Sequence, residues 1–178
     1  ICISGLGGNK ENTALVSNCI PDLNCLDAGT QCFPLYYYEK REPGTPGLFD
    51  STVEDEYLRR DGISDFILKR CHSQYGRNVD KEDIFYYVYG ILHSPVYRER
   101  FAVDLKKMLP RIPLVEGARD FWHFSKAGRK LADLHIHYET VPPYPGVVVT
   151  GEECGFFRVQ KMRFPKKDGV VRGKKKRV

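Results

Sequence analysis

The chain of 178 residues is 42% hydrophobic and 29% charged, a composition typical of folded proteins and unlike that of disordered ones. Its sequence has no run of eighteen apolar residues that would cross a membrane, and residues 1–8 lack the charged start of a signal peptide, so we expect a cytoplasmic protein with no membrane partner. The net charge of +5 is uneven, because residues 161–178 hold nine of the 28 basic residues and only one of the 23 acidic residues.

A strand-rich part opens the chain. The sequence predicts a short strand at residues 1–5, ending in a glycine-rich turn, and apolar strand segments at residues 14–20 and 31–39. Pro34 lies in the last of these and favours an edge strand or a bulge, because proline has no backbone N–H to donate. Residues 40–60 combine prolines, glycines and an acidic cluster, so we expect a mobile connection there.

Helical periodicity follows. The first predicted helix covers Asp61–Gly76, and the second follows an N-cap at Asp80. A third helix is expected to begin at the Ser94–Pro95 pair and to stop before Pro110, and a fourth to cover residues 118–137. The residues predicted to form the apolar faces of the first two helices are Ile63, Phe66, Ile67 and Cys71, then Ile84, Phe85, Val88, Tyr89, Ile91 and Leu92.

A cluster of prolines after residue 141 ends the helical part, and two strands are predicted beyond it, at residues 147–150 and 156–164. The order of elements indicates an α+β fold, with N-terminal and C-terminal β segments around a central group of about four helices. We expect a single domain, composed of a β-rich part with a loop (1–60), a helical part (61–140) and a β-rich basic part (141–178).

Two segments resemble parts of enzyme active sites but lack the residues that the chemistry requires. The run ISGLGG at residues 3–8 has no Lys-Ser or Lys-Thr for a phosphate-binding loop, and a tight turn explains it better. The run VPPY at residues 141–144 resembles a motif of amino-methyltransferases, but Val141 has no acceptor for the amino group. His135 and His137 have no nucleophile beside them in sequence. We therefore expect no catalytic residue in this chain.

The six cysteines are interpreted as buried thiols. They lie at positions 2, 19, 25, 32, 71 and 154, and none of their separations matches the two-residue spacing typical of zinc sites. Disulfides are not expected without a secretory context. The sequence therefore predicts no metal site.

The remaining chemical signal is the positive charge of residues 161–178. A basic strand-turn-strand can enter the major groove of DNA while its neighbours hold phosphates. The alternative is that a lysine-rich end only keeps the chain in solution. The predicted DNA-contacting residues are Lys161, Arg163, Lys166, Lys167, Arg172, Lys174, Lys175, Lys176 and Arg177, with Asn9, Lys10 and Asn12 in the first loop as candidates for base edges.

A second group of basic residues lies on the predicted helices. Acidic residues interrupt it, so a solvated helix face competes with a phosphate-binding surface as its explanation. The members of this group are Arg98, Arg100, Lys106, Lys107, Arg111, Arg119, Lys126, Arg129 and Lys130. Tyrosines that either stack on bases or pack in a core are Tyr36, Tyr37, Tyr38, Tyr86, Tyr87 and Tyr89.

Four long stretches of the chain together resemble the C-terminal specificity region of Type ISP restriction-modification enzymes. They are QCFPLYYYE at 31–39, DIFYYVYGILHSPVYRERFAVDLKKMLPRIPL at 83–114, FWHFSKAGRKLADLHIHYE at 121–139 and FRVQKMRF at 157–164. The resemblance covers most of the chain and depends on long ordered blocks rather than on one short motif.

In that family one bacterial polypeptide carries a nuclease, a helicase-like ATPase, an adenine amino-methyltransferase and, last, a target-recognition domain. The resemblance implies that this chain is a fragment of such a polypeptide, that it recognises double-stranded DNA, and that the upstream methyltransferase and helicase domains are its partners. S-adenosylmethionine, ATP and Mg²⁺ are expected to bind those upstream domains, and no cofactor is expected here. The alternative is a docking scaffold between the methyltransferase and helicase domains with little DNA contact.

Overall fold

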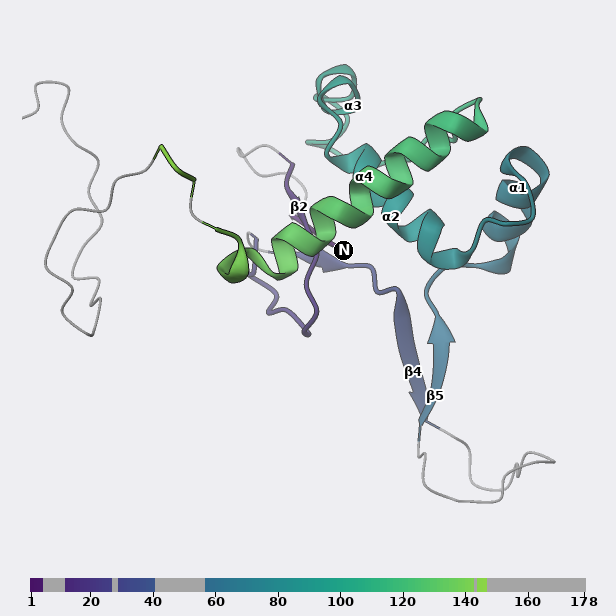
Figure 1. Cartoon of the computed structure of the whole chain (residues 1–178). Coiled ribbons are helices and arrows are strands. Elements are labelled where there is room, and N and C mark those ends of the chain that lie inside the picture. The colour runs from purple at the N-terminus through teal and green to yellow at the C-terminus, as the bar shows by residue number, and fades with distance from the viewer. Residues whose placement is uncertain (5–11, 27–28, 41–56, 143, 147–178) are drawn as a thin grey trace, which may run out of the picture. The chain divides into compact units, whose positions relative to one another are not determined.

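The computed structural model of the chain has an α+β architecture, which confirms the predicted fold class (Figure 1). It describes residues 1–4, 12–26, 29–40, 57–142 and 144–146. The chain divides into two compact units, residues 1–141 and 142–178, and the helices and strands named below all belong to the first. The strands predicted at 147–150 and 156–164 lie outside the described residues.

Three short strands form an antiparallel sheet at the start of the chain. Strand β1 (Cys2–Ile3) is central and pairs with β2 (Ala14–Leu15) on one side and with β3 (Gln31–Cys32) on the other. Both residues of β1 are buried, and Val16 beside β2 is buried as well. The prediction of strands here is therefore confirmed, although each strand is shorter than predicted.

A second sheet consists of two longer antiparallel strands, β4 (Tyr36–Lys40) and β5 (Tyr57–Asp61), which we call the ribbon. The single strand predicted at residues 31–39 is wrong, because the run is divided between β3 and β4. Pro34 lies in the break between them, where no ladder hydrogen bond is required of it. Residues 57–60, predicted as part of a connection, belong to β5.

Helix α1 (Asp65–Tyr75) begins four residues later than predicted, because Asp61 is still part of β5. The Ser64 side chain caps it by accepting a hydrogen bond from the Ile67 N–H at 3.5 Å. Its end at Gly76, which has a φ of 105°, agrees with the sequence. Of the predicted apolar face, Cys71 is buried, but Phe66 is 75% exposed, so the prediction for Phe66 is wrong.

Helix α2 (Lys81–Leu92) has the N-cap that the sequence predicts. Asp80 accepts a hydrogen bond from the Asp83 N–H at 2.7 Å, and the Asp83 carboxylate accepts one from the Asp80 N–H at 3.1 Å. This reciprocal pair satisfies two N–H groups at the helix start that have no partner within the helix. Five of the six residues predicted for its apolar face are buried, namely Ile84, Phe85, Tyr89, Ile91 and Leu92.

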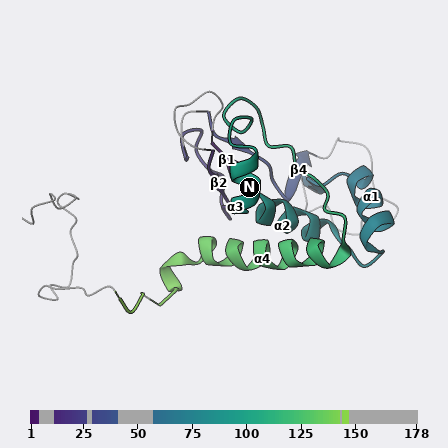
Figure 2. The same ribbon diagram turned by 90° about the horizontal axis from the view of Figure 1, so that it is seen from above.

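Helix α4 (Ala118–Ile136) packs against α2, as two views of the molecule agree (Figures 1 and 2). The contact is so close that glycine is required on both sides. A Cβ added to Gly90 would lie 2.3 Å from the carbonyl oxygen of Phe124, and one added to Gly128 would lie 2.0 Å from that of Tyr86. Backbone therefore meets backbone at this crossing. The predicted helix at 118–137 is confirmed, and the short 3-10 helix η1 (Tyr138–Thr140) follows it.

A stack of aromatic rings connects α1, α2 and α4. Phe121 is fully buried, with its ring centroid 4.4 Å from that of Tyr75 and 4.8 Å from that of Tyr87. Tyrosine hydroxyls at the edge of this core donate to backbone carbonyls of the segment before α4. These bonds run from Tyr75 to Val115 at 2.5 Å, from Tyr87 to Pro113 at 2.6 Å and from Tyr97 to Arg111 at 3.0 Å. Alternate residues of this segment are thus fixed to the core.

Helix α3 (Pro95–Arg100) is shorter than predicted. It begins as expected, with the Ser94 hydroxyl accepting a hydrogen bond from the Tyr97 N–H at 3.4 Å. Tyr97 is its one buried residue, so little apolar surface supports further helical turns. Residues 101–107 form turns instead, and the prediction that the helix continues to Pro110 is wrong.

The cysteines only partly follow the prediction. Cys2 and Cys71 are buried, and burial is the main cause that raises the pKa of Cys2 to about 11. Three others, Cys19, Cys25 and Cys32, are exposed free thiols, because they lie in or beside the connection between β2 and β3, which adds little to the core. Cys154 lies outside the described residues.

Within the described part of the chain, no helix combines the length and the apolar character needed to span a membrane.

Candidate nucleic-acid interface

Asn12 is the predicted DNA-contacting residue that falls within the described part of the chain. The other candidates are Asn9, Lys10, Lys161, Arg163, Lys166, Lys167, Arg172, Lys174, Lys175, Lys176 and Arg177, and they lie outside the described residues.

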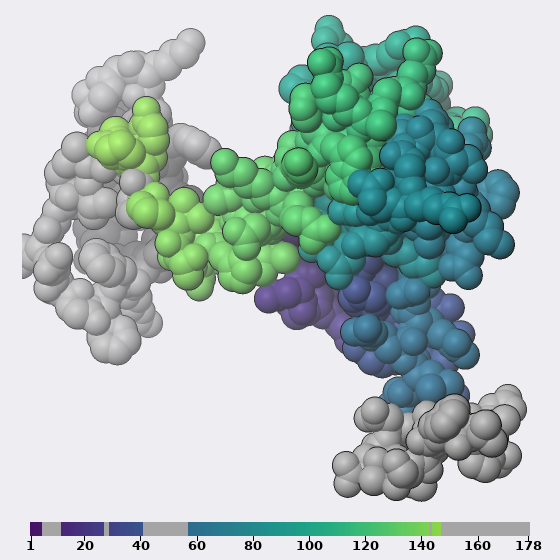
Figure 3. All heavy atoms as spheres, turned by 45° about the vertical axis from the view of Figure 1, so that its right-hand side comes forward, coloured from purple at the N-terminus to yellow at the C-terminus, as the bar shows by residue number. Residues whose placement is uncertain are grey.

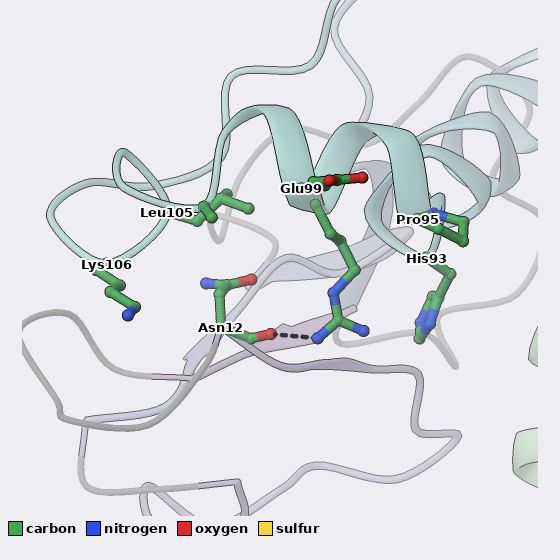
Figure 4. Close-up of a pocket in the computed structure, with 8 residues that line it drawn as sticks. Asn12, His93, Pro95, Glu99, Leu105 and Lys106 are labelled. Atoms are coloured by element: carbon green, nitrogen blue, oxygen red, sulfur yellow. Dashed lines mark hydrogen bonds between the residues drawn. The ribbon is translucent and has the colours of Figure 1, made fainter.

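Asn12 lines an open hollow of about 410 Å³ between the start of β2 and helix α3 (Figure 4). Its backbone carbonyl accepts a hydrogen bond from Nη2 of Arg98 at 3.3 Å, which connects the two sides of the hollow. His93 and Lys106 lie at opposite ends of it. The other lining residues are Pro95, Glu99, Ala102 and Leu105. A side-chain amide at such a position has both a donor and an acceptor for a base edge.

Three charged residues line this hollow, namely Arg98, Lys106 and Glu99. The other exposed charges of α3 and the following turns are Arg100, Lys107 and Asp104, so this stretch of the chain has a net charge of about +2. Cations beside an open hollow suit phosphate oxygens, which supply most of the contacts in protein–DNA interfaces.

His93 forms the inner wall of the hollow and belongs to the packing. Its ring centroid lies 4.6 Å from that of Tyr89 and 5.5 Å from that of His135. Burial lowers the pKa of His93, and the charges of His135 and Arg98 lower it further. The atom Nε2 is buried and has no hydrogen-bond partner among the described residues. The arrangement favours the neutral form of this imidazole.

The other histidines of interest also have structural contacts. Nδ1 of His135 lies 2.5 Å from the hydroxyl oxygen of Tyr89, which also accepts a hydrogen bond from the Val16 N–H at 3.2 Å. Nδ1 of His137 lies 2.9 Å from the carboxylate of Asp133, one turn earlier in the chain. Both histidines therefore have contacts of the kind that packing or surface residues make.

The basic residues of α4 divide into two kinds. Lys126, Arg129 and Lys130 are all exposed, but Arg129 also contacts α2. Its guanidinium lies 3.1 Å from the Glu82 carboxylate, 3.3 Å from that of Asp83 and 4.2 Å from the centre of the Tyr86 ring. Arg129 therefore stabilises the packing of α4 on α2.

The tyrosines likewise fall into two groups. Tyr87 and Tyr89 are fully buried, so the explanation that they pack in the core is confirmed and base stacking by them is excluded. Tyr37 and Tyr38, both on β4, are 43% and 65% exposed. These two tyrosines are accessible to a ligand.

Sequence analysis missed the exposed residues of β5. Tyr57 and Arg59 fall in the part of the chain predicted to be a connection, although they belong to the ribbon. A signal was present, because Tyr57 favours strands and follows the tyrosine-rich run of β4 in the sequence. The intervening prolines and glycines of residues 41–56 concealed it.

Comparison with protein families gives a match over the whole chain. The family model described as the Type ISP C-terminal specificity domain matches residues 1–178. No curated protein matches the chain at a significant level.

Two solved structures resemble the chain in both sequence and fold. The DrdV–DNA complex, determined by cryo-electron microscopy, has a TM-score of 0.64 and 36% identity over 81% of this chain. A nuclease-deletion mutant of the Type ISP restriction-modification enzyme LlaGI, in complex with a DNA substrate mimic, has a TM-score of 0.58 and 34% identity over 82% of this chain. The matched regions are 12% and 10% of the lengths of those chains.

Proposed function

Since this chain belongs to the family of Type ISP C-terminal specificity domains, we propose that it recognises the double-stranded DNA target of a restriction-modification enzyme. The observation that carries the proposal is that two structures with more than 30% identity and the same fold are complexes, one with DNA and the other with a DNA substrate mimic. The whole of residues 1–178 acts as one recognition domain in this proposal.

The basic residues supply the electrostatic part of the recognition. The segment from Lys161 to Arg177, with its net charge of about +8, neutralises phosphates, and the cations around the Asn12 hollow add to it. Asn9, Lys10 and Asn12 supply hydrogen-bonding groups for base edges. Phosphate contacts position the protein on the duplex, and the side chains at base edges select the sequence.

The catalytic steps belong to other parts of a longer polypeptide in this proposal. An adenine amino-methyltransferase, a helicase-like ATPase and a nuclease precede this domain and are its partners within the cytoplasm. They bind S-adenosylmethionine, ATP and Mg²⁺, while this chain binds no cofactor and catalyses no reaction. The small share of each neighbour that the chain covers supports this division.

The proposal is tested by binding of the purified chain to two DNA duplexes. The target sequence is first mapped by sequencing methylated adenines in cells that carry the full-length polypeptide. Fluorescence anisotropy then compares a duplex with that sequence and a scrambled duplex. We expect preference for the target duplex, with a loss of about 10³-fold or more in affinity between 50 and 200 mM salt if six or more phosphates are contacted. Equal, salt-independent or absent binding contradicts the proposal and favours the docking scaffold.

A further inference from the structure

The ribbon is held firmly at its base. The Gly62 N–H donates to the Leu35 carbonyl at 2.7 Å, and a Cβ added to Gly62 would lie 2.0 Å from the Pro34 carbonyl oxygen. The backbones on the two sides of the ribbon are therefore in close contact with each other at its base. Tyr36 donates to the Glu82 carboxylate at 2.9 Å, which connects β4 to the first turn of α2. The base therefore fixes the direction of the ribbon.

A second set of contacts strengthens this base. The ammonium of Lys81 lies 2.8 Å from the Asp61 carboxylate and 2.6 Å from that of Asp65, so it joins the end of β5 to the starts of α1 and α2. Glu82, which receives the Tyr36 hydroxyl, also pairs with Arg129 of α4. Figures 1 and 3 show β4 and β5 extending away from the helices beyond this base.

The pairing of the strands places different charged residues on the two faces of the ribbon. Side chains of directly opposed residues lie on the same face, and successive residues alternate. On one face, Tyr38 is opposite Arg59 and Lys40 is opposite Tyr57, and this set is called the tyrosine–arginine face. On the other face, Tyr37 is opposite Arg60 and Glu39 is opposite Leu58. Nε of Arg60 lies 3.1 Å from the Glu39 carboxylate, so the two charges of this face form an ion pair.

The tyrosine–arginine face is exposed and cationic. Tyr38 is 65% exposed and Tyr57 is 52% exposed, although burial of aromatic rings is favourable. Arg59 and Lys40 give the face two positive charges. Among the described residues of the ribbon, the one carboxylate in register with them is that of Asp61 at the base, which pairs with Lys81. An exposed surface of this composition is complementary to a polyanion.

The Arg59 side chain stacks on an aromatic ring. Its guanidinium lies 4.5 Å from the centre of the Tyr36 ring, and Tyr36 is itself held by Glu82. Stacking on an aromatic ring restricts the side chain while leaving the donors at the edge of the guanidinium available. Arginine oriented in this way can donate two hydrogen bonds to a guanine edge or to a phosphate.

We propose that the ribbon enters the major groove of the target duplex with its tyrosine–arginine face toward the DNA, and that Arg59 donates to a base edge there. The major groove admits a two-stranded β-ribbon, and the ribbon has the charge, the exposure and the fixed base that such an insertion requires. This inference rests on the proposed function and adds a specific element and residue to it. A protein surface as occupant is disfavoured, because Arg59 gives the face a positive charge and the face has no unpaired carboxylate among the described ribbon residues.

The test compares variants of the two faces of the ribbon. Arg59→Ala and Tyr38→Ala change the tyrosine–arginine face, and Arg60→Ala and Tyr37→Ala change the opposite face of the same strands. Each variant of the chain is titrated against the target duplex and the scrambled duplex by anisotropy. Thermal melting of each variant verifies that the fold is retained. All four residues are exposed or half-buried, so the variants are expected to fold.

Loss of a base-reading arginine weakens binding to the target duplex by about 5-fold to 150-fold. We expect a loss in this range for Arg59→Ala, a smaller one for Arg59→Lys, which keeps the charge but not the paired donors, and less than about 2-fold for Arg60→Ala. The scrambled duplex is affected less than the target duplex.

Two results would overturn the inference in distinguishable ways. If the wild-type chain prefers the target duplex and Arg59→Ala and Tyr38→Ala bind it as tightly as Arg60→Ala and Tyr37→Ala do, the ribbon does not contact DNA and the proposed function stands. If the wild-type chain shows no preference for the target duplex, the proposed function fails and the ribbon inference fails with it.

Discussion

Tyrosine has opposite roles in the helical core and in the ribbon. In the core, Tyr87 is fully buried, stacks on Phe121 and has its hydroxyl satisfied by the Pro113 carbonyl. In the ribbon, Tyr38 and Tyr57 are exposed beside cationic residues. The buried rings stabilise the fold, whereas the exposed rings add little to it and are available for binding. The core and the ribbon thus respond differently to substitution.

The largest expected loss of stability comes from the centre of the aromatic stack. Phe121→Ala removes a fully buried ring between Tyr75 and Tyr87, and such truncations cost about 3–5 kcal/mol of unfolding free energy. Urea denaturation measures it. The matched control is Phe66→Ala, because Phe66 is 75% exposed and its truncation is expected to cost less than about 0.5 kcal/mol. Equal losses would contradict the account of the core.

The crossing of α2 and α4 is expected to be the next most sensitive position. Gly128→Ala places a methyl group 2.0 Å from the Tyr86 carbonyl oxygen, where backbone cannot move aside easily. We expect a loss of about 1–3 kcal/mol, as for other overpacked positions, even though alanine favours helices more than glycine does. A variant more stable than the wild type would show that the helices are not in backbone contact.

A cap at the start of α2 has a smaller effect. Asp80→Ala removes the acceptor of the Asp83 N–H and is expected to cost about 1 kcal/mol, measured by urea denaturation. Asp80→Ser keeps a capping oxygen and is expected to restore most of the loss. Equal stability of the two variants would show that the capping bond does not contribute.

The pH dependence of stability reports on His93. Its pKa is lowered in the folded state, so the unfolded chain binds a proton first as the pH falls. The unfolding free energy is therefore expected to decrease as the pH falls through about 6.5, the ordinary value for histidine. His93→Gln removes this part of the pH dependence, whereas His123→Gln, on the exposed surface of α4, serves as the control. A profile that His93→Gln leaves unchanged would contradict the assignment.

The smallest effect on stability is expected in the ribbon. Tyr38→Ala removes a ring that is 65% exposed, so the unfolding free energy changes by less than about 0.5 kcal/mol. The same change is expected to weaken DNA binding, which separates the role of this tyrosine from that of Tyr87. A large loss of stability would show that the ribbon belongs to the core and would remove the contrast.

Local signals explain which parts of the fold were predictable. Ser64, Asp80 and the Ser94–Pro95 pair mark helix starts through bonds within a single turn, and the sequence located α2 and α3 correctly at their starts. The division of residues 31–39 and the strand nature of β5 depend on pairing with distant segments, which a single-sequence pattern does not contain. The contact between Gly90 and Gly128 is likewise non-local.

The candidate site was predictable in character but not in detail. Uneven charge along the chain indicated a polyanion as partner, and family membership agrees with DNA. Asn12 lies in a hollow beside cations, but Arg129, which sequence alone placed in a basic group, is committed to ion pairs with Glu82 and Asp83. Whether a cation faces a ligand or a carboxylate depends on tertiary packing.

The most direct measurement exchanges this region between two relatives. Methylated adenines are sequenced in cells carrying the native full-length polypeptide and in cells carrying the same polypeptide with residues 1–178 replaced by the matching region of a relative. The account predicts that the methylated sequence changes to that of the relative. An unchanged methylated sequence, with methylation still active, would show that recognition resides elsewhere in the polypeptide.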